Sequence, residues 1–104
     1  MKVELLYFDG CPGHEALLPR LRELVAEAGH PPDALELRAV ESLDDAERVG
    51  FLGSPSVRVN GEDVEPGAAG RDGFGLKCRI YRGQGKQSRT PPEEWIRTAL
   101  EGAR

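Results

Sequence analysis

The sequence predicts a single α/β domain, residues 1–104, whose central mixed sheet has about four strands and is flanked by helices. Two observations predict this fold class. In the first half of the chain a strand, a helix and a second strand follow one another, which is the order of a βαβ unit. After a second helix, an Asn-Gly pair joins two short strands, which indicates a hairpin. A helix closes the chain, so the expected order is βαβαββα.

The N-terminal elements have clear boundaries in the sequence. Val3 to Phe8 is a brief apolar run, which predicts a strand covered on both faces. Pro12 suits the first position of the helix that follows, and Gly29 ends it. Pro19 breaks the pattern and should kink this helix.

The middle of the chain predicts three strands and a short helix. Residues 35–40 predict a strand, in which Leu35, Leu37 and Ala39 alternate with Glu36, Arg38 and Val40. Ser42 can cap a helix that runs to Val49. Residues 56–59 predict the next strand. Asn60-Gly61 suits a tight turn, so residues 62–65 should form the return strand. Near the C-terminus, Thr90 as N-cap, Pro91 at the first position and Glu93 as the partner in a capping box predict the last helix.

Residues 66–90 are rich in glycine and are expected to form an insertion before the last helix. Leu76, Cys78 and Ile80 alternate with polar residues, which predicts an edge strand. This segment carries a net charge of +5 (Arg71, Lys77, Arg79, Arg82, Lys86 and Arg89 against Asp72), whereas residues 1–65 carry −8. Two interpretations stay open, a solvated loop and a surface for an anionic ligand or partner; nucleic-acid binding is not predicted.

Composition points to a soluble globular protein. Hydrophobic residues make up 38% and charged residues 31% of the chain, and no apolar run has membrane-spanning length. Glu4 makes the N-terminus a poor signal peptide, so a cytoplasmic location and no membrane partner are expected. In that reducing compartment the two cysteines should be free thiols.

Several motifs resemble those of the thioredoxin-like superfamily. Cys11-Pro12-Gly13-His14 resembles the C-x-x-C box at the end of the first strand, and Pro19 resembles the kinking proline eight residues further on. Gly53-Ser54-Pro55-Ser56 resembles the cis-proline loop, and the hairpin at Asn60-Gly61 resembles that of glutaredoxins. The resemblance covers residues 1–65 and the last helix. It implies a cis Pro55 facing Cys11, with Pro12, Gly13, Ser54, Pro55 and Ser56 contacting a thiol substrate.

Cys11 is the predicted reactive thiol. It lies at or just before the start of the first helix, where unpaired N–H groups and the helix dipole stabilise a thiolate. His14 replaces the second cysteine of the box, so a disulfide within the box cannot form. His14 either moves a proton at Cys11 or only fills the first turn.

Cys78 has two interpretations. It can be the resolving thiol for Cys11, with Arg79 and Lys77 lowering its pKa, or a buried apolar residue beside Leu76 and Ile80. The second is slightly favoured.

Three functions follow from these residues. The first is a small thiol–disulfide redox protein, a possible oxidoreductase. In it Cys11 attacks a protein disulfide or a low-molecular-weight thiol adduct, His14 assists, and Cys78 or an external thiol resolves the product. No cofactor is expected, with glutathione as the candidate co-substrate. The second is a carrier of a soft metal (Hg, Zn or Cu) held by Cys11, His14 and Cys78. The third is a non-catalytic interaction module.

Overall fold

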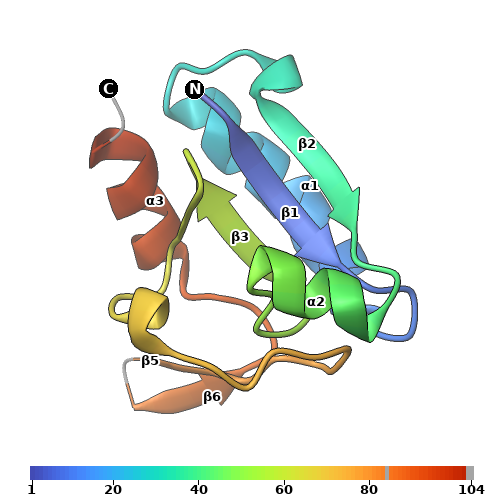
Figure 1. The fold of residues 1–104 in the computed structure, drawn as a ribbon. Helices are drawn as coiled ribbons and strands as arrows, with labels where there is room; N and C mark the ends of the chain where they lie inside the picture. The colour runs from blue at the N-terminus through green and yellow to red at the C-terminus, as the bar shows by residue number, and fades with distance from the viewer. Residues whose placement is uncertain (84, 103–104) are drawn as a thin grey trace.

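A computed structural model of the chain describes residues 1–83 and 85–102. Its main sheet contains β1 (Val3–Tyr7), β2 (Leu35–Ala39), β3 (Ser56–Val59) and β4 (Glu62–Asp63), in the order β2-β1-β3-β4 (Figure 1). β1 pairs in parallel with β2 and antiparallel with β3, which pairs antiparallel with β4. The expected four-stranded mixed sheet with a βαβ start is therefore confirmed.

Helices cover both faces of this sheet. α1 (Gly13–Glu27) and α3 (Glu93–Gly102) lie on one face, and α2 (Leu43–Val49) lies on the other (Figure 1). Side chains of β1 alternate between two cores: Leu5 packs with residues of α1 and α3, and Leu6 packs with Ala46 of α2. Burial on both sides explains the near-continuous apolar run of β1. Within the described ranges, no helix has both the length and the apolar character needed to cross a bilayer.

The turn and cap signals of the middle segment are confirmed. The hydroxyl of Ser42 accepts a hydrogen bond from the backbone N–H of Asp45 at 3.1 Å and caps α2. Asn60 and Gly61 have φ angles of 52° and 85°, which are the positive values that the two-residue hairpin turn requires. The return strand is shorter than expected and covers only Glu62–Asp63.

Both long helices begin later than the sequence indicated. Pro12 is the N-cap of α1 rather than its first residue. α3 begins at Glu93, so the expected capping box with Thr90 is wrong. The N–H of Thr90 donates to the Ser88 hydroxyl, and the Glu93 carboxylate binds Arg20 of α1 instead. A long-range ion pair has therefore replaced the local cap.

The segment before α3 differs most from expectation. It contains a 3₁₀ turn, η2 (Ala68–Gly70), and a separate hairpin of β5 (Tyr81–Gly83) and β6 (Lys86–Ser88). The expected edge strand over Leu76, Cys78 and Ile80 is wrong. The side chains that point inward are also not the expected apolar ones. Arg79 and Tyr81 are 2% and 0% exposed, whereas Ile80 is 53% exposed. The polar positions point inward because the Arg79 guanidinium reaches Asp63 of β4.

Candidate functional site

Cys11 lies between β1 and α1, as expected, but its surroundings differ from those predicted. Its N–H donates to Phe8 O at 3.2 Å, and its Sγ donates to Ser54 O at 3.6 Å. The residue is only 1% exposed, so the predicted reactive thiol does not lie open to solvent. Among residues 1–83 and 85–102, no backbone amide donates to this sulfur, although amides at the start of α1 were expected to hold it.

The loop before β3 lies against the start of α1. The Ser54–Pro55 peptide bond is cis, as the resemblance implied. A Cβ on Gly13 would lie 3.2 Å from Cδ of Pro55, so the first turn of α1 packs closely on the proline ring. The Tyr81 hydroxyl donates to Pro55 O at 2.5 Å. Contacts from α1 and from the segment after β4 therefore hold this loop next to Cys11.

Cys78 reaches the same loop from the far end of the sequence. Ser54 N donates to Lys77 O at 2.8 Å, and Arg79 N donates to Ser54 O at 2.9 Å, which makes a single parallel bridge between Ser54 and Cys78. Gly53 permits this approach. A Cβ there would lie 2.9 Å from Cβ of Arg79, and its φ of 128° is one that L side chains rarely adopt.

Ser54 brings the two cysteines to one place. Cys11 Sγ donates to Ser54 O, Ser54 pairs with Cys78 in the parallel bridge, and both cysteines are free. Cys78 is exposed while Cys11 is buried, so the interpretation of Cys78 as a buried apolar residue is wrong.

The electrostatics at Cys78 are the reverse of those expected. The hydrogen bond to Cys11, partial burial and the charge of Cys11 together raise the pKa of Cys78 above that of an ordinary thiol. The cation that opposes this rise is Arg89, not Arg79 or Lys77. The Arg79 side chain turns into the protein, and Lys77 Nζ donates to Gly73 O at 2.5 Å.

Arg79 anchors the chain next to Cys78, a role that the sequence did not reveal. Its guanidinium donates to both carboxylate oxygens of Asp63, at 2.7 and 3.1 Å, and to the Ser56 hydroxyl at 2.9 Å. It also lies 4.4 Å from the centre of the Tyr81 ring. Burial disfavours the charged form, but the Asp63 hydrogen bonds and nearby carboxylates outweigh it and raise the pKa of Arg79. The spacing of Asp63 and Glu65, two residues apart on the return strand that the sequence predicted, is the signal that could have suggested a buried cation.

His14 contacts the backbone of Cys11. Its Nδ1 lies 2.9 Å from Cys11 O, and its ring stacks on Tyr7 with the ring centres 4.1 Å apart. Because a carbonyl oxygen can only accept, Nδ1 carries the proton in this arrangement. The ring therefore fixes the turn that holds Cys11.

The other expected substrate residues are largely enclosed. Pro12 is exposed, but Ser54 and Ser56 are 0% and 1% exposed. The Ser56 hydroxyl donates to Gly53 O at 2.6 Å, so it serves the loop itself. Within the described part of the chain no three His, Cys, Asp or Glu side chains are placed to hold a metal ion, and the expected set of Cys11, His14 and Cys78 is not assembled.

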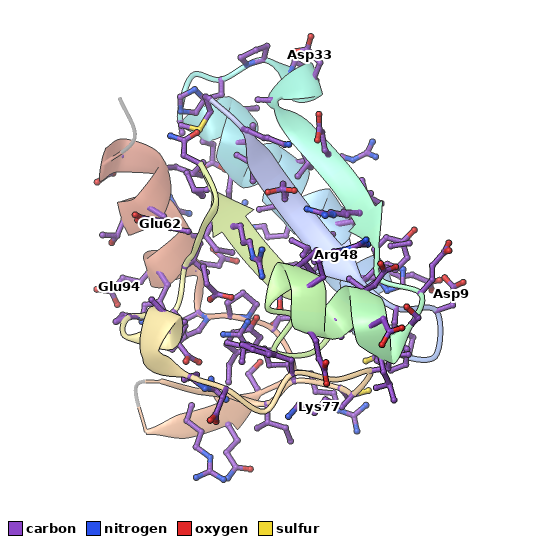
Figure 2. All side chains as sticks on the ribbon, in the orientation of Figure 1. Asp9, Asp33, Arg48, Glu62, Lys77 and Glu94 are labelled. Carbon is purple, nitrogen blue, oxygen red and sulfur yellow. The ribbon has the colours of Figure 1, made fainter. Side chains whose placement is uncertain are left out.

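Two cations of the basic segment form ion pairs with carboxylates. Arg71 binds Glu65 at 2.6 Å and Arg79 is buried, so a fully solvated loop does not describe it. The side chain of Lys86 lies outside the described residues. A cleft of about 590 Å³ opens between the end of α2 and residues 61–74, and neither cysteine lines it. Figure 2 shows Lys77 on the stretch that passes below α2.

Comparisons with known proteins identify no relative: no family model, no curated protein and no solved structure matches this chain.

Proposed function

We propose that this chain is a thioredoxin-like thiol–disulfide redox protein in which Cys11 and Cys78 form the redox couple. The observation that carries the proposal is that both cysteines lie at Ser54, although they are remote from each other in the sequence: Cys11 Sγ donates to Ser54 O, and Ser54 pairs with Cys78 in a parallel bridge. A disulfide between the two sulfurs would be about 2.05 Å long.

The surrounding fold supports the same proposal. The pair lies where β1 ends and β3 begins, next to the cis Ser54–Pro55 bond and the first turn of α1. The resemblance implies this arrangement for a thiol site. The box lacks its second cysteine because His14 occupies that position, and Cys78 supplies a second sulfur from a different segment.

The exposure of the two sulfurs favours an order of steps opposite to that suggested by the box. Cys78 is exposed and Cys11 is 1% exposed, so a disulfide substrate reaches Cys78 first. The Cys78 thiolate attacks one substrate sulfur, and the first substrate thiol leaves with the proton lost by Cys78. Cys11 then attacks the Cys78 sulfur of the mixed disulfide, and the second substrate thiol leaves with the proton of Cys11. Two electrons pass from the protein to the substrate.

An external dithiol, or two molecules of a thiol such as glutathione, reverses these steps and restores both thiols. The positive charge of Arg89 acts on Cys78, which suits a substrate that carries negative charge near its disulfide. His14 acts as a positioning residue in this scheme, because its Nδ1 bonds to the carbonyl of Cys11.

The experiment is to oxidise the purified chain with diamide and to map disulfides by mass spectrometry of peptides. The expected product is an intramolecular Cys11–Cys78 disulfide in a monomer. Cys78→Ser is the matched control, in which the oxidised monomer should contain no disulfide. If wild-type Cys11 and Cys78 remain unlinked under conditions that oxidise exposed thiols, the proposal is wrong.

A further inference from the structure

The outer edge of β2 is open. β2 is the first strand in the sheet order and pairs only with β1, and within the described residues no strand covers its other side (Figure 1). Four of its five residues are exposed, including Leu37 at 43%. An uncovered edge with an exposed leucine is a template for pairing with another strand.

The backbone of β2 fixes which residues can pair. Val40 N donates to Tyr7 O at 2.7 Å, so even-numbered residues of this strand point their N–H and C=O groups toward β1. Because these groups alternate sides along a strand, those of Leu35, Leu37 and Ala39 point to the open edge. A second strand can therefore form hydrogen-bonded pairs with these three positions.

The side chains favour a second copy of the same strand. If two copies of β2 pair antiparallel with Leu37 opposite Leu37, then Leu35 lies opposite Ala39 and Glu36 lies opposite Arg38. In this register all three outward-facing residues become hydrogen-bonded pairs. Opposite charges also face each other twice, which stabilises a strand pair, whereas like charges there would oppose it. Charged residues that only prevent an edge strand from pairing need not be placed so that Glu36 of one copy faces Arg38 of the other.

Apolar surface lies beside the same edge. A cavity of about 370 Å³ between β2 and α1 is lined by Arg22 and by five apolar residues: Val25, Ala26, Pro32, Leu35 and Leu37. In a symmetric pair Leu37 of each copy lies next to the other, so two such surfaces become continuous across the two-fold axis.

We infer that this chain forms a symmetric dimer through antiparallel pairing of β2, with Leu37 at the two-fold axis. The inference is independent of the thiol chemistry. β1 separates β2 from β3, and the Ser54–Cys78 bridge precedes β3, so the paired edges do not include the segment that carries Cys78.

Sedimentation equilibrium under a reducing agent tests the dimer, since reduction excludes disulfide-linked species. The weight-average mass of the wild type should rise from 11.4 kDa toward twice that value between micromolar and near-millimolar concentration. Leu37→Lys, which places two cations together at the axis, should weaken association by about tenfold or more. Leu43→Lys is the matched control, because Leu43 is 63% exposed on α2, and it should associate like the wild type.

Charge variants test the register. Glu36→Lys alone places cations opposite each other, and Arg38→Glu alone places anions opposite each other, so each variant should be monomeric. An equimolar mixture of the two restores both opposite-charge pairs and should form a heterodimer. Circular dichroism confirms that each variant is folded.

A wild type that remains monomeric at every concentration overturns the inference. So does a dimer that persists unchanged in Leu37→Lys, because its interface then lies elsewhere. Neither result affects the mapping of Cys11 to Cys78, so the two proposals fail separately.

Discussion

Cys78 is exposed to solvent, and the neighbouring Cys11 raises the pKa of its thiol. The hydrogen bond to Cys11 is the largest influence on it, followed by partial burial and the charge of Cys11, and all three raise its pKa. A raised pKa lowers the fraction of Cys78 that is thiolate at neutral pH, and the thiolate is the nucleophile. The reactivity of the exposed sulfur is therefore set by the buried one.

Replacing Cys11 should make Cys78 ionise more easily. In Cys11→Ala the hydrogen bond and the neighbouring charge are lost, so the pH profile of Cys78 alkylation by iodoacetamide should move to lower pH. Arg89→Ala should move the profile in the opposite direction, because Arg89 lowers the pKa of Cys78. Unchanged profiles in both variants would show that the two groups do not act on Cys78.

Tyr81 should make the free energy of unfolding fall at alkaline pH. Burial raises its pKa above that of an ordinary tyrosine. Its contribution to stability is complete below the ordinary value of about 10 and is lost as pH rises, because only the unfolded chain ionises it readily. Tyr81→Phe should cost about 1–3 kcal/mol at neutral pH, since the bond to Pro55 O is lost. Its free energy of unfolding in urea should then fall less than that of the wild type between about pH 8 and about pH 11. An equal fall in both proteins would contradict this.

At the scale of elements, the chain from Lys77 to Tyr81 is attached to the main sheet by a small number of strong contacts. Two backbone hydrogen bonds join it to Ser54, and the Arg79 guanidinium joins it to Asp63 of β4. The Tyr81 hydroxyl adds a bond to Pro55 O. These contacts keep Cys78 next to Cys11.

Removing the buried cation should be costly. Arg79→Met leaves the carboxylate of Asp63, whose side chain is 12% exposed, without its guanidinium partner, and should destabilise the fold by about 3–5 kcal/mol. Arg48→Met is the control, because Arg48 is 73% exposed and, among the described residues, its ion pair is with Asp45, so about 0.5 kcal/mol or less is expected. Urea unfolding at neutral pH compares them, and similar losses in the two variants would contradict a structural role for Arg79.

The same segment shows why part of the structure could not be predicted. Alternation of Leu76, Cys78 and Ile80 suggested an apolar inner face, yet Arg79 and Tyr81 point inward. The polarity pattern of a short segment cannot show that Asp63, which is distant in sequence, forms an ion pair with the buried Arg79. Signals that act between near neighbours were dependable, as in the Ser42 cap and the Asn60-Gly61 turn. The cap at Thr90 failed because Arg20, remote in sequence, binds Glu93.

At the scale of the whole molecule, the sheet and helices were predictable because their apolar patterns match one packed arrangement. β1 carries side chains for both cores, and its partners on either side follow from the βαβ order and the hairpin. The cis Ser54–Pro55 bond followed from the resemblance. The position of Cys78 did not, since it depends on Arg79 and on the close approach at Gly53.

Oxidation should stabilise the whole fold. A Cys11–Cys78 disulfide closes a long loop and should add about 4 kcal/mol by restricting the unfolded chain. The midpoint of urea unfolding should therefore be higher for the oxidised than for the reduced wild type. Cys78→Ser should show no such difference, and an equal midpoint for both wild-type forms would show that the native structure does not accommodate the bond.

The central claim is that Cys11 and Cys78 exchange two electrons as one couple. An equilibrium titration against glutathione redox buffers, with the disulfide quantified by peptide mass spectrometry, tests it most directly. The account predicts a single transition with a two-electron slope of about 30 mV per tenfold change, ending in the Cys11–Cys78 disulfide. Stable glutathione adducts on Cys78 with Cys11 still reduced, or no change at any buffer ratio, would contradict it.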